Sequence, residues 1–278
     1  MLYYTYDGSF EGLLTVIFEA YERKAWPDQI GKEGEAHPGI FAAHRLVITD
    51  EAKAQRVWKG LAQKLSATAL ENVYRVYLWE QPGFEMLLFQ FIKLVFSARQ
   101  PGVEENFTEA CVQKVAAVGK QMFREKHRME AFVRFQRTAD GLFVAPISPD
   151  FNVLPLIIPH FQHRYADQLW LIYDLRRKYG AYYDGAQVQL VSLDDKAMAL
   201  HQIDLPAAAL DTLEPLYQQL WQAYFDHVNI PERKNRKLHR QHMPQRYWKY
   251  LPEKKPRRQE HQPIRNKQPP AGVSRLPA

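Results

Sequence analysis

The periodicity of the apolar residues changes near Glu130, and this change constrains the fold more than any other feature of the sequence. Before it, apolar residues recur at spacings of three and four, which is typical of amphipathic helices. After it, the stretch Ala131–Asp150 alternates apolar and polar residues around an Asp140-Gly141 pair, which predicts a β-hairpin. A chain that changes from helical to strand periodicity in this way is expected to have an α+β fold.

The first 127 residues are expected to be mostly helical. A short strand over Tyr3–Tyr6 comes first, and the Gly- and Pro-containing stretch from Trp26 to Val47 is expected to be a loop. The predicted helices run from Glu11 to Lys24 with Ser9 as N-cap, from a Thr49 or Asp50 cap to Leu65, from Thr68 to Trp79, from Pro82 to Ala98, and from Thr108 to about Lys126.

The middle of the chain is expected to form an antiparallel sheet from Ala131 to about Leu193 with one packed helix, in the order ββ-α-βββ. Pro155 and Pro159 would bound a short helix that ends near Tyr165. Turns at Gly180 and Gly185 would separate the last three strands. A C-terminal amphipathic helix is predicted over Asp211–Val228.

These patterns divide the chain into four expected regions. They are a mostly helical region 1–127, an antiparallel α+β region 128–230, a basic aromatic arm 231–253, and a tail 254–278 whose composition predicts disorder.

Charge is distributed unevenly along the chain. Of its 37 Lys and Arg residues, 14 lie in Pro231–Ala278 together with three Asp or Glu, which gives that segment a net charge of +11. The first 230 residues then hold 23 basic and 28 acidic residues, a net charge of −5. A basic segment on a mildly acidic body favours a polyanionic partner, and we expect that partner to be DNA.

Composition excludes several classes of protein. Cys111 is the single cysteine, so an internal disulfide and a site built from several cysteine ligands are excluded. No apolar run reaches the roughly 18–20 residues of a membrane span, and the first residues lack the basic and apolar parts of a signal peptide. We expect a cytoplasmic protein with no membrane partner and no cofactor.

The segment Pro231–Arg258, PERKNRKLHRQHMPQRYWKYLPEKKPRR, interleaves cations with aromatic rings. Cations neutralise phosphates and rings stack on unpaired bases, so the pattern predicts a nucleic-acid-binding arm. The residues expected to contact nucleic acid are Arg233, Lys234, Arg236, Lys237, Arg240, Arg246, Tyr247, Trp248 and Lys249. The alternatives are a solvated arm whose Tyr247 and Trp248 pack onto the body, or a segment that binds a protein.

A second group of polar residues lies near the change of periodicity. The catalytic candidates are His127, Arg128, Arg134, His160, Arg164 and Asp167. If these side chains converged in one cleft, the histidines could exchange protons near neutral pH. The structural alternatives are that His127 and Arg128 stabilise a helix C-terminus, or that the cluster fixes a helix on a sheet.

Two further expectations concern this polar group. Arg164, Asp167 and Asp174 are expected to have partners inside the protein, because buried charges require them. His160 and His163 have a spacing that metal ligands can use, but spacing alone is weak evidence and we expect no metal site.

Three blocks of the sequence resemble a bacterial family of uncharacterised DNA metabolism and DNA repair proteins. They are Tyr6–Glu22, His127–Gly180 and Asn229–Glu253. The resemblance implies a genomic association with a radical SAM protein similar to spore photoproduct lyase. Some relatives also carry a uracil-DNA-glycosylase-like domain, and no base-excision chemistry is carried over to this sequence. The family provides no established catalytic residues.

These observations favour a nucleic-acid-binding accessory protein in bacterial DNA repair or modification, acting with the radical SAM partner. One alternative is an enzyme that acts directly on DNA through the six catalytic candidates. Another is a protein-assembly module.

Overall fold

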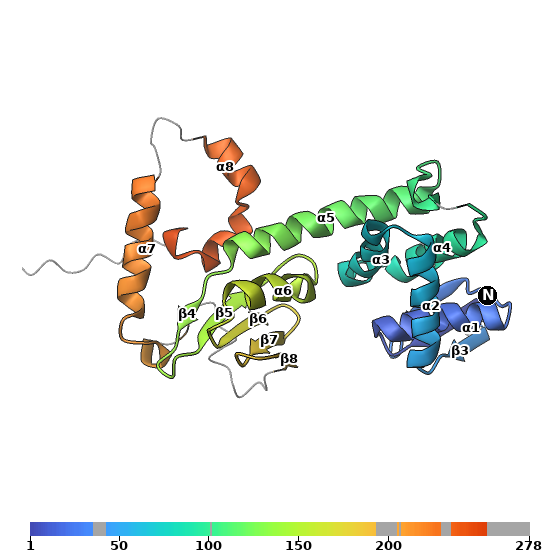
Figure 1. Cartoon of the computed structure of the whole chain (residues 1–278), viewed down its shortest axis with the longest axis horizontal. Helices are drawn as coiled ribbons and strands as arrows, with labels where there is room; N and C mark the ends of the chain where they lie inside the picture. The colour runs from blue at the N-terminus through green and yellow to red at the C-terminus, as the bar shows by residue number, and fades with distance from the viewer. Residues whose placement is uncertain (36–42, 101, 193–204, 206, 229–234, 255–278) are drawn as a thin grey trace, which may run out of the picture. The chain divides into compact units, whose positions relative to one another are not determined.

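The computed structural model describes residues 1–35, 43–100, 102–192, 205, 207–228 and 235–254 (Figure 1). The chain divides into two compact units, Met1–Glu214 and Pro215–Ala278. The first unit combines helices with two sheets, and the described part of the second is helical, so the α+β class is confirmed.

Five helices precede the main sheet. They are α1 (Phe10–Glu22), α2 (Glu51–Lys64), α3 (Ala67–Trp79), α4 (Phe84–Ser97) and α5 (Ala110–Phe132). All five predicted helices are therefore confirmed, although α5 continues to Phe132 instead of ending near Lys126. None of the helices in the described part of the chain is long and apolar enough to cross a membrane.

Local capping explains why these helices begin where they do. The Ser9 hydroxyl accepts a hydrogen bond from the Gly12 amide (2.9 Å), and Asp50 accepts one from the Lys53 amide (3.1 Å). Both caps satisfy amides that have no partner within the helix. The two predicted N-caps are thus confirmed.

A small parallel sheet lies in the N-terminal part of the first unit. Its strands are β1 (Leu2–Tyr6), β2 (Gln29–Lys32) and β3 (Ala43–Leu46), in the order β2-β1-β3. The prediction of a loop from Trp26 to Val47 is wrong for β2 and β3. Both are four-residue strands whose pairing to β1 bridges a long stretch of sequence, so they leave little periodic signal.

The second sheet has five strands in the order β4-β5-β6-β7-β8. They are β4 (Gln136–Arg137), β5 (Phe143–Ile147), β6 (Trp170–Asp174), β7 (Tyr179–Tyr183) and β8 (Val188–Val191). Helix α6 (Leu154–Arg164) connects β5 to β6, so the predicted order ββ-α-βββ is confirmed.

The expectation of an entirely antiparallel sheet is wrong for one pair. Strands β5 and β6 are parallel, with Phe143 opposite Trp170 and Ile147 opposite Asp174, whereas the other three pairs are antiparallel. The reason is the crossover through α6, which returns the chain to the same end of the sheet before β6 begins.

The turn predicted at Gly180 and the helix boundary predicted at Pro159 are not at these residues in the structure. Gly180 is inside β7, and the chain turns before it, where Lys178 adopts a positive φ of 57°. A Cβ at Gly180 would lie 2.9 Å from the Ile172 carbonyl oxygen, so close strand packing explains this glycine. Pro159 lies inside α6 and does not end it, whereas the predicted end near Tyr165 is confirmed.

Aromatic side chains fill the space between α6 and the five-stranded sheet. Trp170 of β6 is fully buried. The Trp170 ring contacts Phe161 of α6 edge-on at 6.5 Å and stacks on Tyr183 of β7 at 5.3 Å. Such rigid rings bury large apolar areas and fix the helix over the strands.

Glu85, in the first turn of α4, is a buried acidic side chain in the helical part of the first unit. It is 7% exposed, and burial raises the pKa of its carboxyl above the usual 4.5. Burial also raises the pKa of Tyr6, whose hydroxyl is inaccessible. Removing the Glu85 proton therefore places a charge in a poorly solvated environment.

The Glu85→Gln variant should be more stable than the wild type at pH 7. Above pH 4.5 the unfolded chain loses this proton before the folded chain does, so the free energy of unfolding falls as pH rises towards the folded pKa. The stability difference should shrink towards pH 4, measured by thermal unfolding across pH. Glu33→Gln, at an exposed position, is the control; an equal gain there would refute the assignment.

Candidate functional site

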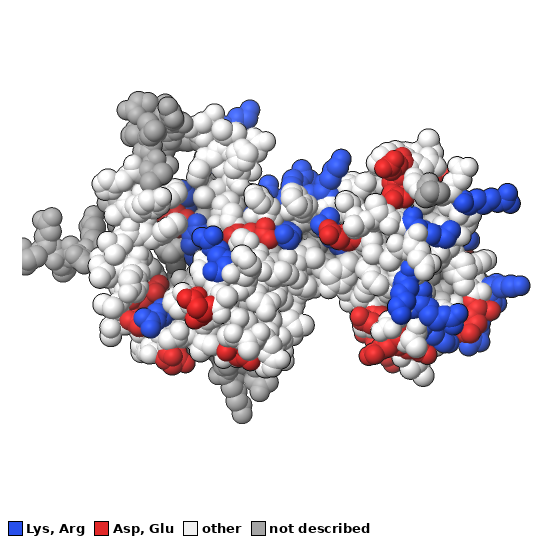
Figure 2. Space-filling model, viewed as in Figure 1, with Lys and Arg blue, Asp and Glu red and all other residues white. Residues whose placement is uncertain are grey.

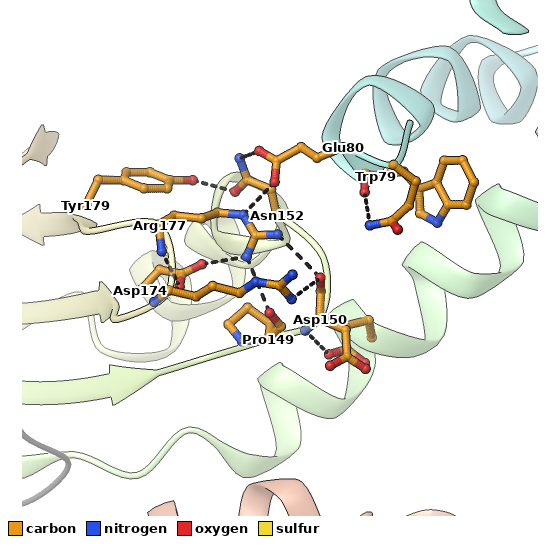
Figure 3. A network of polar contacts seen from close by, with 11 residues as sticks. Trp79, Glu80, Pro149, Asp150, Asn152, Asp174, Arg177 and Tyr179 are labelled. Carbon is orange, nitrogen blue, oxygen red and sulfur yellow. Dashed lines mark hydrogen bonds and ion pairs between the residues drawn. The ribbon is translucent and has the colours of Figure 1, made fainter. Parts of the chain in front are cut away.

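An ion pair between the buried Asp174 and the half-buried Arg177 lies in the network of polar contacts drawn in Figure 3. Arg177, in the turn after β6, donates to the Asp174 carboxylate (3.0 Å) and to the Glu80 carboxylate (2.7 Å). Asp174 is fully buried, and its other oxygen accepts from the Arg176 and Arg177 amides. A buried carboxylate is stable only with such partners.

The network connects the helices to the sheet. Asn152, in the loop after β5, donates to Glu80 (2.9 Å) and accepts from the Tyr179 hydroxyl (2.6 Å) of β7. Arg177 also donates to the carbonyl oxygen of Pro149 (3.3 Å) in the same loop. Glu80 follows the last residue of α3, so three segments distant in sequence are joined at one point.

The electrostatics agree with a structural role. The pKa of Arg177 is raised above its ordinary value. Burial acts to lower this pKa, but the hydrogen bond to Glu80 and the charges of Glu80 and Asp174 outweigh the effect of burial. Burial also raises the pKa of Tyr179. Arg177 is therefore charged at neutral pH, and its guanidinium donates to two carboxylates and to two carbonyl oxygens of the loop after β5.

The expectation of internal partners is confirmed for Asp174 and wrong for two other residues. Arg164 and Asp167 are exposed. Arg164 is the last residue of α6 and Asp167 belongs to the turn that follows, where side chains reach water. Only Asp174 of the three lies on a strand buried on both faces.

Two aspartates seven residues apart give a matched test of this network. Asp174→Ala should lower the free energy of unfolding by about 3 kcal/mol, because it leaves a buried guanidinium short of a partner. Asp167→Ala should change it by less than about 0.5 kcal/mol. Urea unfolding measures both. Equal losses at the two positions would contradict the assignment.

The six catalytic candidates lie on separate parts of the first unit. His127 is exposed on α5, and Arg128 lies 3.7 Å from the Glu125 carboxylate. Arg134 follows α5 and donates to the Ala131 carbonyl oxygen (2.8 Å). His160, on α6, meets the ring of its neighbour Phe161 edge-on, and Arg164 lies over the Tyr165 ring.

No hydrogen bond or ion pair joins any two of these six described residues. General acid–base or nucleophilic catalysis needs a donor and an acceptor within hydrogen-bond reach, directly or through one water. The described contacts therefore pair no candidate with another, and a catalytic role for them stays a prediction. Among the residues it describes, no three His, Cys, Asp or Glu side chains are grouped so that they could hold a metal ion.

The described part of the basic arm is folded. It contains α8 (Arg236–His242) and the 3-10 turns η5 (Gln245–Tyr250) and η6 (Pro252–Lys254). Four predicted nucleic-acid contacts are exposed there: Lys237, Arg240, Arg246 and Lys249. Arg233 and Lys234 lie outside the described residues, and for Arg236 the description covers the backbone in α8 but not the side chain.

The two predicted aromatic contacts of the arm, Tyr247 and Trp248, differ in burial. Tyr247 is 2% exposed, with the Arg246 guanidinium over its ring at 4.5 Å. Trp248 is half-buried, and its indole N–H donates to the Met243 carbonyl oxygen (3.1 Å). Burial hides the ring face of Tyr247 that a base would need, whereas stacking by the half-buried Trp248 stays a prediction.

Helix α7 (Glu214–Val228) presents a surface that the sequence analysis missed. Five large side chains on and next to it are between 47% and 60% exposed: Leu213, Leu216, Tyr217, Leu220 and Tyr224. Their spacing of three and four places them along one face of the helix. The amphipathic pattern was visible in the sequence, but the sequence did not show that this face lacks a covering element among the described residues.

A comparison with known protein families identifies the family of this chain. A model of DUF4130, a domain of unknown function, matches residues 82–253. The chain belongs to the DUF4130 family. The DUF4130 region contains α5, the five-stranded sheet, α7 and the described part of the arm up to Glu253.

Other comparisons add little. No curated protein matches the chain. Among solved structures, a pGpG-specific phosphodiesterase, PggH, from Vibrio cholerae is similar at 10% identity with a TM-score of 0.32. The match covers 82% of this chain and 99% of that one. A likeness this distant does not bear on activity.

Proposed function

We propose that this protein is a nucleic-acid-binding accessory protein in bacterial DNA repair or modification. The observation that carries the proposal is the set of exposed cations on the folded arm, Lys237, Arg240, Arg246 and Lys249. All four lie on two short helical segments separated by Met243 and Pro244, so they can contact successive phosphates from a defined surface. Phosphate neutralisation is the dominant source of affinity for nucleic acid.

Net charge supports the same assignment. The second unit, Pro215–Ala278, holds 14 basic and four acidic residues, a net charge of +10. The first unit then holds 23 basic and 27 acidic residues, a net charge of −4. A polyanion would therefore be attracted to the second unit and weakly repelled by most of the first.

The lack of described contacts between the six catalytic candidates favours an accessory role over an enzymatic role. The reaction on DNA would then belong to the radical SAM protein implied by the resemblance, and this chain would supply binding. A direct enzymatic role would require these side chains to meet, and the described hydrogen bonds and ion pairs join no two of them.

Replacing Lys237, Arg240 and Lys249 together with Gln should weaken binding of DNA. Each lost phosphate contact removes roughly 0.7–0.9 from the slope of log affinity against log salt, so three contacts should flatten it by about 2–3. Fluorescence anisotropy of a labelled oligonucleotide over a series of salt concentrations measures this slope.

The matched control replaces Lys24, Lys59 and Arg99, which are exposed on the first unit, and makes the same change in net charge. We expect this control to bind with nearly the wild-type slope. If both triple variants lose the same slope, binding follows net charge alone and the arm is a solvated segment.

A second candidate function, protein assembly, is favoured by the exposed apolar face of α7. Side chains at three- and four-residue spacing are a common way for a helix to enter a groove of a partner. We propose the radical SAM protein as the occupant of this face. It is a partner of the same proposed pathway, so assembly and DNA binding can occur together.

Leu220→Asp should abolish a complex between this chain and the purified radical SAM protein in analytical ultracentrifugation, because it places a charge in the centre of the apolar face. Leu190→Asp, at an exposed leucine of β8 (66% exposed), should leave the complex intact. A complex that survives Leu220→Asp would rule out this face.

A further inference from the structure

The outward face of α5 carries cations that lack carboxylate partners. Lys120 and Arg124 are exposed, and no Asp or Glu among the described residues lies within ion-pair distance of either. Figure 2 shows Lys and Arg side chains along the outer edge of this helix. The two positions are one helical turn apart, about 6 Å along the axis.

The two acidic residues of α5 do not offset this charge. Glu125 is buried, accepts from the Asp150 amide (3.0 Å) and lies 3.7 Å from Arg128. Glu130 is paired with Lys126 at 2.7 Å. By contrast, several cations elsewhere in the first unit are paired with carboxylates, such as Arg23 with Glu19 and Arg75 with Glu71.

Two rings lie beside these cations. Phe123 is 55% exposed although it belongs to a long helix with a well-packed inner face. Its ring is parallel to that of His127, with an interplanar angle of 5° and centroids 6.5 Å apart. Proteins that bind single-stranded nucleic acid without sequence preference combine cations with exposed flat rings in this way.

We propose that the outward face of α5, formed by Lys120, Phe123, Arg124 and His127, is a second contact for single-stranded nucleic acid. Lys120 and Arg124 neutralise backbone phosphates, and an unpaired base stacks on the Phe123 ring. The inference rests on the proposed function, but it adds a site on the first unit that is separate from the basic arm. It also assigns His127 to binding and not to proton transfer.

The contribution of the two cations to binding is tested with the double variant Lys120→Gln/Arg124→Gln in the full chain. Its matched control is Lys59→Gln/Arg99→Gln, which removes two exposed cations elsewhere in the first unit. Anisotropy with a labelled oligo(dT) strand should show the salt slope falling by about 1.4 for the α5 pair, at roughly 0.7 per phosphate contact, and staying unchanged for the control. Thermal unfolding confirms that both variants are folded.

The contribution of base stacking is tested with a second variant and its matched control. Phe123→Leu should weaken single-strand binding by about 5- to 150-fold, the equivalent of one stacked base, and leave binding of a duplex of the same length nearly unchanged. Phe107→Leu, at a phenylalanine with the same 55% exposure just before α5, should have no such effect.

The outcomes separate this inference from the proposed function. If the arm variant weakens binding but the α5 variants match their controls, the α5 site is refuted and the proposed function stands. If the α5 variants act as predicted and the arm variant does not, the α5 site is supported and the arm is not the main contact. If the wild-type chain binds no nucleic acid, both are refuted.

Discussion

The pair formed by Arg177 and Asp174 is the interaction on which the first unit depends most. Asp174 is fully buried at the end of β6, so its charge must be compensated within the protein. The same guanidinium binds Glu80 at the end of α3 and carbonyl oxygens of the loop after β5. One residue thus fixes the sheet to the helices, and it does so where the parallel β5–β6 crossover places the loop and the turn at the same edge.

Elements set by local signals could be predicted, whereas those set by distant pairing could not. Helices α1 to α4 followed from caps such as Ser9 and Asp50 and from apolar spacing, and the hairpin at Gly141 followed from its turn chemistry. The parallel pairing of β5 with β6 and the small β2-β1-β3 sheet depend on which strands meet in space. Nothing in a strand of four or five residues specifies its distant partner, so these features were missed.

The same distinction between local sequence signals and distant contacts applies to the residues of the candidate site. Exposed cations such as Lys237 and Arg240 could be predicted because a dense basic segment has few ways to be buried. The exposure of the rings could not be predicted, since it depends on how each element packs: Tyr247 of the arm is buried, while Phe123 of α5 is 55% exposed. His127 and His160 were grouped by sequence pattern alone, and the fold keeps them on different helices.

The central claim is that this chain binds nucleic acid through exposed cations and not through a catalytic cleft formed by the six polar candidates. Hydrogen–deuterium exchange with and without a single-stranded oligonucleotide tests it most directly. The account predicts slower exchange in Arg236–Tyr250 and in the exposed half of α5, with no change in His160–Asp167. Protection centred on His160–Asp167, or no protection anywhere at saturating oligonucleotide, would contradict it.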